Sequence, residues 1–492
     1  MICVIGSLGT SCKKGYFDIN ENPNSPSTVP AKFLLPTALV NSARQLEGGN
    51  QDFANYWMGY WAVSAGFGAD ANLLTYNVTT NFATGNWLGN YITLRNYKDM
   101  ITQGTNDSTL INFRAISRVM WAHHFMHIVD LYGNAIYSDY GNYEEDLFPG
   151  YDDAQSIYLD LLVQLDGAIA DVETGKAILA SKPADTEDLV FAGNMDNWEK
   201  FANNLKLKIL MHMSNKTELN TIVTQGLSGI DQTIGFYLDD VKLNPGYNNG
   251  NTVSQNPRWA NIGFAVNGES YGNRNYVRAN AYAVNFLTSK ADGRLPYIYD
   301  LNNAGTIKGR VFGSDNFTGE TNTEISPVGG SRLLRLERKG ILKDEDMDSY
   351  LMPAYQIDFL LAEAYQRGLL EGDAKVAYEA GINSSFSLVG APELAIGAII
   401  GYANFENAVD KLDAIYRQAW IAGNTYDAFE SYTTWRRTGY PKDLPISIYP
   451  GTNTDHIPYR LAYPLQEYSF NAQNVEAQGA INPLSTKIFW MP

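Results

Sequence analysis

Cysteine is almost absent from this chain of 492 residues. The only two, Cys3 and Cys12, lie within the first dozen positions, so the rest of the chain has no disulfide, no thiol nucleophile and no cysteine-bound metal. Basic residues are also scarce, because 36 Lys and Arg face 53 Asp and Glu, which gives a net charge of −17. Binding to phosphate depends on clustered Lys and Arg, and no basic run here exceeds two residues. A nucleic-acid partner is therefore excluded.

Long apolar runs and catalytic motifs are missing as well. Beyond residue 12 no apolar stretch approaches the ~20 residues that span a bilayer. The sequence contains no GxSxG elbow and no phosphate-binding loop. We therefore predict a protein that binds rather than catalyses, without a cofactor or a metal ion. A secreted glycosidase is the alternative, because the many carboxylates are enough to supply a catalytic acid pair.

Apolar and aromatic residues are plentiful. Hydrophobic residues make up 45% of the chain and include 32 Tyr, 21 Phe and 9 Trp, whereas charged residues make up 18%. Ordinary soluble domains have roughly 25% charged residues. The chain can thus bury a large core, and its excess of rings indicates a further role for aromatic surface.

The first 30 residues have the pattern of an exported, lipid-anchored protein. The short apolar segment Ile2–Leu8 is followed by the small residues Gly9–Ser11 and then by Cys12. This order predicts a signal peptide over residues 1–11 and a lipidated N-terminal Cys12. Residues 12–30 are rich in Asn, Pro and Ser, which predicts an extended tether. The alternative is that Cys12 is an ordinary buried cysteine in a first strand.

Helical periodicity dominates the rest of the chain. Apolar residues three and four apart predict helices over Ala31–Leu46, Phe53–Ala65, Trp87–Ile101, Leu110–Leu131, Ala154–Val172, Trp198–Met213 and Met352–Leu370. Residues 232–349 are instead rich in Gly, Asn, Tyr and Pro, which predicts a long loop-rich insertion. We expect a mostly α fold, with residues 31–492 forming a single domain.

One segment is similar to a tetratricopeptide helix pair. It consists of LAEAYQRG (Leu361–Gly368) followed by Gly372, Ala374, Ala377, Tyr378 and Ala380. Small residues at helical spacing allow two antiparallel helices to approach closely. No second copy follows at the 34-residue spacing of a regular solenoid.

The chain resembles the SusD/RagB family of nutrient-binding outer-membrane lipoproteins. Six stretches carry the resemblance: DINENPNSP (Asp18–Pro26), DLYGNAIYSDY (Asp130–Tyr140), WEKFANNLKLKILMHMS (Trp198–Ser214), FLLAEAYQRG (Phe359–Gly368), WRRTGYP (Trp435–Pro441) and RLAYPLQEYSFN (Arg460–Asn471). The resemblance implies a tetratricopeptide-like helical scaffold with a ligand face built from loops. It also implies a lipid-anchored protein on the outer membrane that faces the exterior. Such a protein captures oligosaccharide and docks on a SusC-like, TonB-dependent β-barrel transporter. A peptide or other non-glycan nutrient, or a role only in closing the barrel, are the alternatives.

Sugar binding requires flat rings for C–H faces and amide or charged groups for hydroxyls, and the stretch from Gly66 to Tyr91 offers both. Tyr76 lies in a loop, and Trp87 and Asn90 lie three apart at a helix start, on one side of the helix. In the family, a Trp and an Asn at the corresponding helix start can contact glycan. The alternative is that Trp87 only fastens the helix to its neighbour.

The stretch from Asn244 to Tyr282 is the strongest compositional signal for a binding site. Tyr247, Trp259, Tyr271 and Arg274 lie there among Asn and Gly residues. The guanidinium of Arg274 has several donors in a fixed fork, which suits hydroxyl groups. The alternative is that these side chains pack the loops onto the helical scaffold.

Two other patterns match metal-binding motifs only in part. His123 and His127 are four apart, as zinc ligands often are, but His124 replaces the glutamate of an HExxH motif. We therefore predict surface or core histidines. The acidic run Asp344–Asp348 resembles the start of a calcium loop, but Ser349 replaces its turn glycine, so we expect a solvated acidic turn.

The Arg residues of WRRTGYP and RLAYPLQEYSFN are expected to fix the C-terminal segment to carboxylates or helix-end carbonyls.

The lipid anchor can be tested directly. Replacing the thiol in Cys12→Ser removes the only acylation site of the predicted mature N-terminus, so the protein should move from the membrane fraction to the soluble fraction. Fractionation followed by immunoblotting measures this distribution, with Ser11→Ala as the control. A variant that stays with the membrane would refute anchoring through Cys12.

Overall fold

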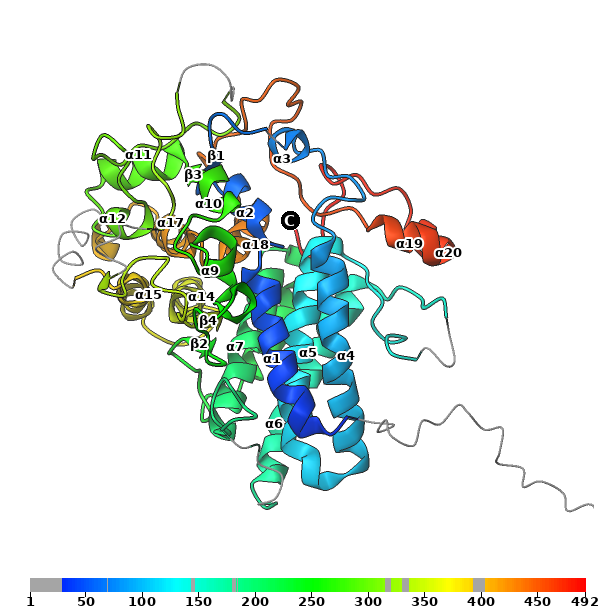
Figure 1. Ribbon diagram of the computed structural model, residues 1–492. Helices are drawn as coiled ribbons and strands as arrows, with labels where there is room; N and C mark the ends of the chain where they lie inside the picture. Colours follow the sequence, from blue (N-terminus) through cyan, green and yellow to red (C-terminus); the bar gives the residue numbers. More distant parts are fainter. Residues whose placement is uncertain are drawn as a thin grey trace, which may run out of the picture.

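Long helices form the body of the protein, as the periodicity of the sequence predicts (Figure 1). The computed structural model describes residues 29–68, 70–142, 147–178, 183, 185–314, 320–329, 336–392 and 403–492. The predicted signal peptide, Cys12 and the tether up to residue 28 lie outside these ranges, so the anchor remains a prediction.

The described elements are mostly α-helical. The longer helices are α1 (Ala31–Glu47), α4 (Gly85–Asn106), α5 (Ile111–Tyr132), α6 (Ala154–Gly175), α7 (Met195–Met213), α14 (Ala354–Gln366), α15 (Ala374–Val389), α17 (Lys411–Gly423) and α18 (Ala428–Thr438). The shorter ones are α2 (Asp52–Trp57), α3 (Ala71–Thr75), α8 (Asn220–Ser228), α9 (Pro257–Ile262), α10 (Gly272–Tyr276), α11 (Ala281–Ser289), α12 (Leu295–Ile298), α19 (Leu465–Phe470) and α20 (Ala472–Glu476). The strands are β1 (Trp61–Val63), β2 (Val241–Leu243), β3 (Val277–Ala279) and β4 (Ser349–Met352).

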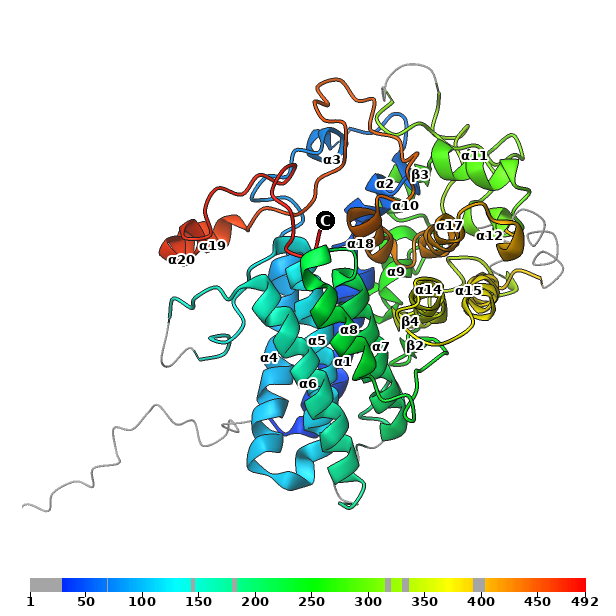
Figure 2. The same ribbon diagram turned by 180° about the vertical axis from the view of Figure 1, so that it is seen from behind.

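Helix α5 lies at the centre of an upright bundle. It packs against α4, α6, α7 and α1, and almost all of its side chains are buried (Figure 1). A helix that is apolar all round requires such neighbours on every side. Seen from behind, α8 covers the outer side of α7 (Figure 2).

The second group of helices contains the tetratricopeptide-like pair. Helices α14 and α15 pack closely, and α17 and α18 continue the layer. Of the small residues predicted to allow this approach, Gly372 does so, because a Cβ there would overlap the ring of Tyr365. Gly381, which was not part of that prediction, is equally close to the ring of Phe359. Side-chain caps define several helix starts, since Asp373 accepts from the backbone of α15 and Asp410 from that of α17.

The predicted helix over Phe53–Ala65 is wrong in its second half. Helix α2 ends at Trp57, and Trp61–Val63 forms strand β1, which pairs antiparallel with β3. Gly59 has a φ of +74°, a left-handed conformation that ends the helix and turns the chain. The second sheet pairs β2 with β4, also antiparallel.

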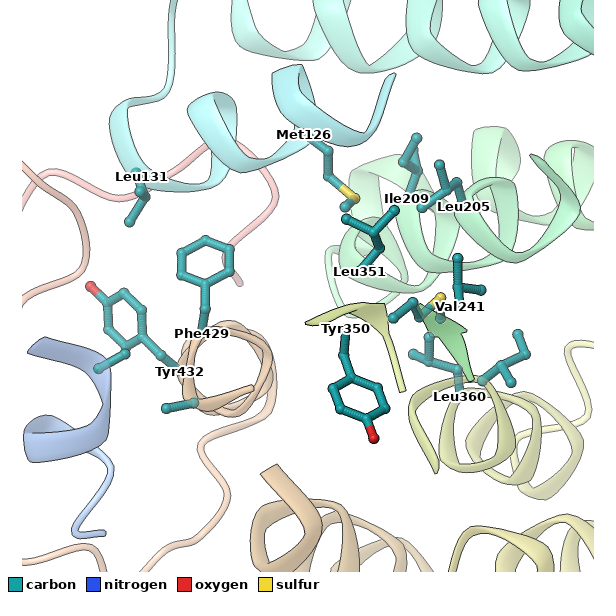
Figure 3. Close-up of a cluster of buried hydrophobic side chains, with 14 of the residues drawn as sticks. Met126, Leu131, Leu205, Ile209, Val241, Tyr350, Leu351, Leu360, Phe429 and Tyr432 are labelled. Atoms are coloured by element: carbon teal, nitrogen blue, oxygen red, sulfur yellow. The ribbon is translucent and has the colours of Figure 1, made fainter. Parts of the chain in front are cut away.

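The predicted insertion at residues 232–349 is rich in loops. Its described part contains elements of at most nine residues, the longest being α11. Beneath it, helices and strands from both halves of the chain share one core (Figure 3). The side chains labelled there are Met126 and Leu131 of α5, Leu205 and Ile209 of α7, Val241 of β2, Tyr350 and Leu351 of β4, Leu360 of α14, and Phe429 and Tyr432 of α18. The core is thus shared between these elements, and the single domain over residues 31–492 stays a prediction.

The C-terminal segment is fixed to the end of α5, as the sequence predicts. Arg436 donates to the carbonyl of Asp130, and Arg460 donates to the carbonyl of Tyr132. These are the last carbonyls of the helix, where a cation is favoured by the helix dipole. Gly133 follows with a φ of +74°, and a Cβ there would lie 3.1 Å from Arg460 Nη1, so the turn requires glycine.

A buried ion pair links α14 to α18. Arg437 Nη1 and Nη2 donate to the two carboxylate oxygens of Glu363 at 2.7 and 2.5 Å, and Arg367 Nη1 adds a contact at 2.9 Å. Burial alone disfavours the carboxylate, but the guanidinium of Arg437 outweighs it and lowers the pKa of Glu363.

Glu363→Gln tests the contribution of this pair. The variant leaves the guanidinium of Arg437 buried without its counter-charge, so the free energy of unfolding at pH 7 should fall by about 3–5 kcal/mol. Because the pKa of Glu363 is lowered, its contribution is complete above the ordinary value of 4.5 and disappears as the pH falls through the lowered value. Urea unfolding at several pH values measures both effects.

The exposed Glu371→Gln is the matched control, with an expected change within about 0.5 kcal/mol. Equal stability of the Glu363 and Glu371 variants would contradict the assignment.

Candidate ligand-binding site

Trp87, predicted to stack on a ligand, lies in the core of this structure. Its side chain is 1% exposed, and its ring stacks on Tyr151 at 5.9 Å and meets Tyr463 edge to face at 5.6 Å. Nε1–H donates to Glu467 Oε1 at 3.1 Å. The described conformation thus favours the alternative, in which Trp87 fastens α4 to the C-terminal segment.

Asn90 is also buried, one turn along α4. Its Oδ1 lies 2.6 Å from His124 Nδ1, and His124 Nε2 lies 2.7 Å from Ser42 Oγ. Burial lowers the pKa of His124 to about 3 and that of His127 to about 4, so both are neutral at physiological pH. The histidines of α5 are therefore core residues, as predicted. No three His, Cys, Asp or Glu side chains come together as metal ligands in the part of the chain that the structure describes.

Three further predicted ligand residues have the same buried character. Tyr76 accepts from the backbone N–H of Ser447 at 2.9 Å, and Tyr247 Oη lies 3.1 Å from Ser349 Oγ. Trp259 donates from Nε1 to the carbonyl of Phe264 at 3.0 Å. Their exposed fractions are between 2% and 7%, which leaves little surface for a ligand.

A groove of about 680 Å³ opens between the end of α1 and the helices α9 and α10. We call it the α9–α10 groove; it is lined by Arg44, Gly48, Thr252, Val253, Gln255, Pro257, Ala260, Asn261, Tyr271, Gly272 and Asn273. Its volume is within the range of small-molecule sites. Of the predicted ligand residues, Tyr271 is the one that lines it.

The side chains of the groove are held in place by their neighbours. Tyr271 is half-buried, and its Oη lies 2.8 Å from Gln255 Oε1 and 3.2 Å from Thr252 Oγ1. Asn256 caps α9 by accepting from the backbone N–H of Trp259 at 3.0 Å. A half-buried ring beside fixed amide and hydroxyl groups is suited to a polyhydroxylated ligand.

Arg274, also predicted to contact a ligand, is not among the residues that line the groove. It is buried, donates to the carbonyl of Val328 at 2.9 Å, and has its guanidinium 4.5 Å from the ring centre of Phe264. The ring of Trp259 lies 5.6 Å from the same Phe264. In this conformation Arg274 and Trp259 position the loop between α9 and α10 instead of facing solvent.

A second groove, of about 360 Å³, adjoins the turn that ends α1. We call it the α2–α3 groove; it is lined by Gly49, Asn50, Asp52, Phe53, Tyr56, Asp70, Asn72, Leu73, Thr79, Asn81, Phe82 and Ala83. The half-buried ring of Phe82 stacks on Trp57 at 5.6 Å with an interplanar angle of 4°. This groove also combines a supported ring with amide groups.

Two other cavities are less suited to such a ligand. The groove of about 400 Å³ beside the start of α7 has no aromatic side chain among its described lining residues. The cavity among α14, α17 and α18 has a volume of about 40 Å³, far below that of small-molecule sites. Protein cations pair with part of the acidic turn, because Arg338 contacts Asp346 at 2.7 Å and Lys242 contacts Asp348 at 2.9 Å.

The sequence missed most of the residues that line the two grooves. Asn261 and Asn273 lie within the stretch from Asn244 to Tyr282, and Asn81 and Phe82 lie within the stretch from Gly66 to Tyr91. None of the four is among the predicted ligand residues. Their signal was compositional, whereas Arg44 gave no signal because it belongs to an ordinary amphipathic helix.

Residues 23–464 match the model of the SusD-like family, described as starch-binding and associating with the outer membrane. A search of curated proteins gave no significant match.

Solved structures share the fold. A chitin-binding SusD homologue from Flavobacterium johnsoniae is 22% identical, with a TM-score of 0.74 over 94% of this chain and 98% of that one. SusD homologues from Bacteroides fragilis and Bacteroides vulgatus are 21% and 20% identical, with TM-scores of 0.76 and 0.75. They cover 94% and 92% of this chain, and 99% and 97% of their own lengths. Because the family match spans most of the sequence and the helical architecture agrees, the chain belongs to the SusD-like family.

Proposed function

We propose that this protein captures an oligosaccharide at the cell surface and delivers it to a SusC-like, TonB-dependent transporter in the outer membrane. The observation that carries the proposal is the α9–α10 groove, in which a half-buried tyrosine ring lies beside amide and hydroxyl groups held by hydrogen bonds. The outer-membrane association in the family description supports the location. The lipid on Cys12 would hold the protein there, facing the exterior.

The chemistry of the groove supports a glycan over a strongly charged nutrient. Arg44 is the one charged side chain among its described lining residues, and the remaining polar groups are neutral. Neutral amides donate to and accept from sugar hydroxyls, and an aromatic face packs against the C–H groups of a sugar ring. We propose binding without turnover.

No helix within the described residues is both long and apolar enough to cross a membrane. We propose that docking to the transporter barrel uses the folded body together with the anchor at Cys12.

A glycan panel tests the proposal. The body comprising residues 13–492 should bind one class of plant, host or microbial glycan and release no reducing sugar. Tyr271→Ala should weaken that binding about tenfold, which corresponds to about 1.4 kcal/mol for the lost ring and hydroxyl contacts. Calorimetry and a reducing-sugar assay give the two readouts, with Tyr297→Ala, outside both grooves, as the control.

Binding of peptides in place of glycans would reassign the ligand class, and release of sugar would establish an enzyme. Silence across the panel would favour a role only in closing the barrel.

The variant Trp87→Ala tests whether the Trp87 side chain stabilises the fold or contacts the ligand. Because Trp87 is buried among aromatic rings, the variant should lower the free energy of unfolding by about 3–5 kcal/mol, whereas Trp87→Phe should cost less. At a temperature where both variants are folded, glycan affinity should match that of the unmodified protein. Loss of affinity with unchanged stability would show that Trp87 contacts the ligand.

A further inference from the structure

The two grooves lie next to each other along the chain. Gly48 lines the α9–α10 groove, and Gly49 lines the α2–α3 groove. Successive Cα atoms are about 3.8 Å apart, so the linings of the two grooves adjoin at the turn that ends α1. Neither glycine has a side chain that would raise a barrier between them.

A line of polar side chains crosses from one groove to the other. Asn273 Nδ2 donates to Asn261 Oδ1 at 2.7 Å, and Asn261 Nδ2 donates to Asp52 Oδ2 at 2.7 Å. Asn273 and Asn261 line the first groove, and Asp52 lines the second. We call these three residues the polar bridge.

The polar bridge is held in a fixed orientation. Arg258, which is buried, donates to Asp52 Oδ1 at 2.5 Å, so the carboxylate is fixed from the protein side. Asn261 uses one of its two amide hydrogens on Asp52, and Asn273 uses one of its own on Asn261. The bridge thus presents oriented amide groups at the boundary between the grooves.

Each groove has its own aromatic surface. Tyr271 lines the α9–α10 groove and Phe82 lines the α2–α3 groove, and both residues are half-buried. Asn81, which is exposed, adds an amide beside Phe82. Ring and amide therefore occur twice, on the two sides of the polar bridge.

We propose that the two grooves and the polar bridge bind one linear, uncharged oligosaccharide that continues from one groove into the other. This inference rests on the proposed function and deepens it, because it makes chain length a determinant of affinity. The carboxylates of Asp52 and Asp70 line the α2–α3 groove without a cation among its described lining residues, and Arg258 neutralises only Asp52. An acidic glycan would meet repulsion there.

Oligosaccharide ladders test the inference. Malto- and chito-oligosaccharides from disaccharide to octasaccharide are titrated against the body of residues 13–492 by calorimetry. In the series that binds, affinity should rise with length until both grooves are filled and then level off. Asn81→Ala should weaken the long members about three- to tenfold and leave the short ones unchanged, because short chains occupy the α9–α10 groove alone.

Tyr271→Ala should weaken every member, and Asn220→Ala on α8, outside both grooves, should weaken none. Oligogalacturonides should bind worse than neutral chains of equal length, with the difference largest at low salt.

Affinity that is independent of length and insensitive to Asn81→Ala, yet lost in Tyr271→Ala, would overturn the continuous track and leave the proposed function intact. Absence of binding in both series, together with silence across the wider glycan panel, would overturn the proposed function and this inference with it.

Discussion

The end of α5 is the point on which the arrangement of the C-terminal half depends. Two guanidinium groups, from Arg436 and Arg460, donate to its last carbonyls and fix a segment that comes from the far end of the chain. From there the segment runs to Leu465, whose N–H donates to the carbonyl of Thr80 at 3.0 Å, between two residues that line the α2–α3 groove, Thr79 and Asn81. The position of that groove is thus determined by contacts made at a helix end in the core.

A cluster of buried charged side chains joins three helices of the body. Lys208 Nζ lies 2.8 Å from Glu430, and His212 lies within 3.3 Å of both Glu430 and Asp130. Burial disfavours a charged imidazole, but the two carboxylates outweigh it and raise the pKa of His212. Such a cluster holds α5, α7 and α18 in one register, because removing any partner would leave another charge buried and unpaired.

The helices could be predicted from the sequence because their signal is local, whereas the site could not. Trp87 and Tyr271 lie in similar Asn- and Gly-rich surroundings, yet one is core and the other lines a groove. The difference for Trp87 is Glu467, a hydrogen-bond partner 380 positions away, which no local pattern reveals. The end of α2 was missed for a smaller reason: Gly59 adopts a left-handed conformation inside a stretch whose apolar spacing still fits a helix.

Helix α1 runs from the foot of the bundle to the turn beside the two grooves. Its first residue, Ala31, donates to Gln103 at the foot of the bundle, and its last, Glu47, adjoins the turn between the two grooves. At about 1.5 Å per residue, its 17 residues set a spacing of about 25 Å. The helix therefore fixes the distance between the turn beside the two grooves and the start of α1, which follows the predicted tether.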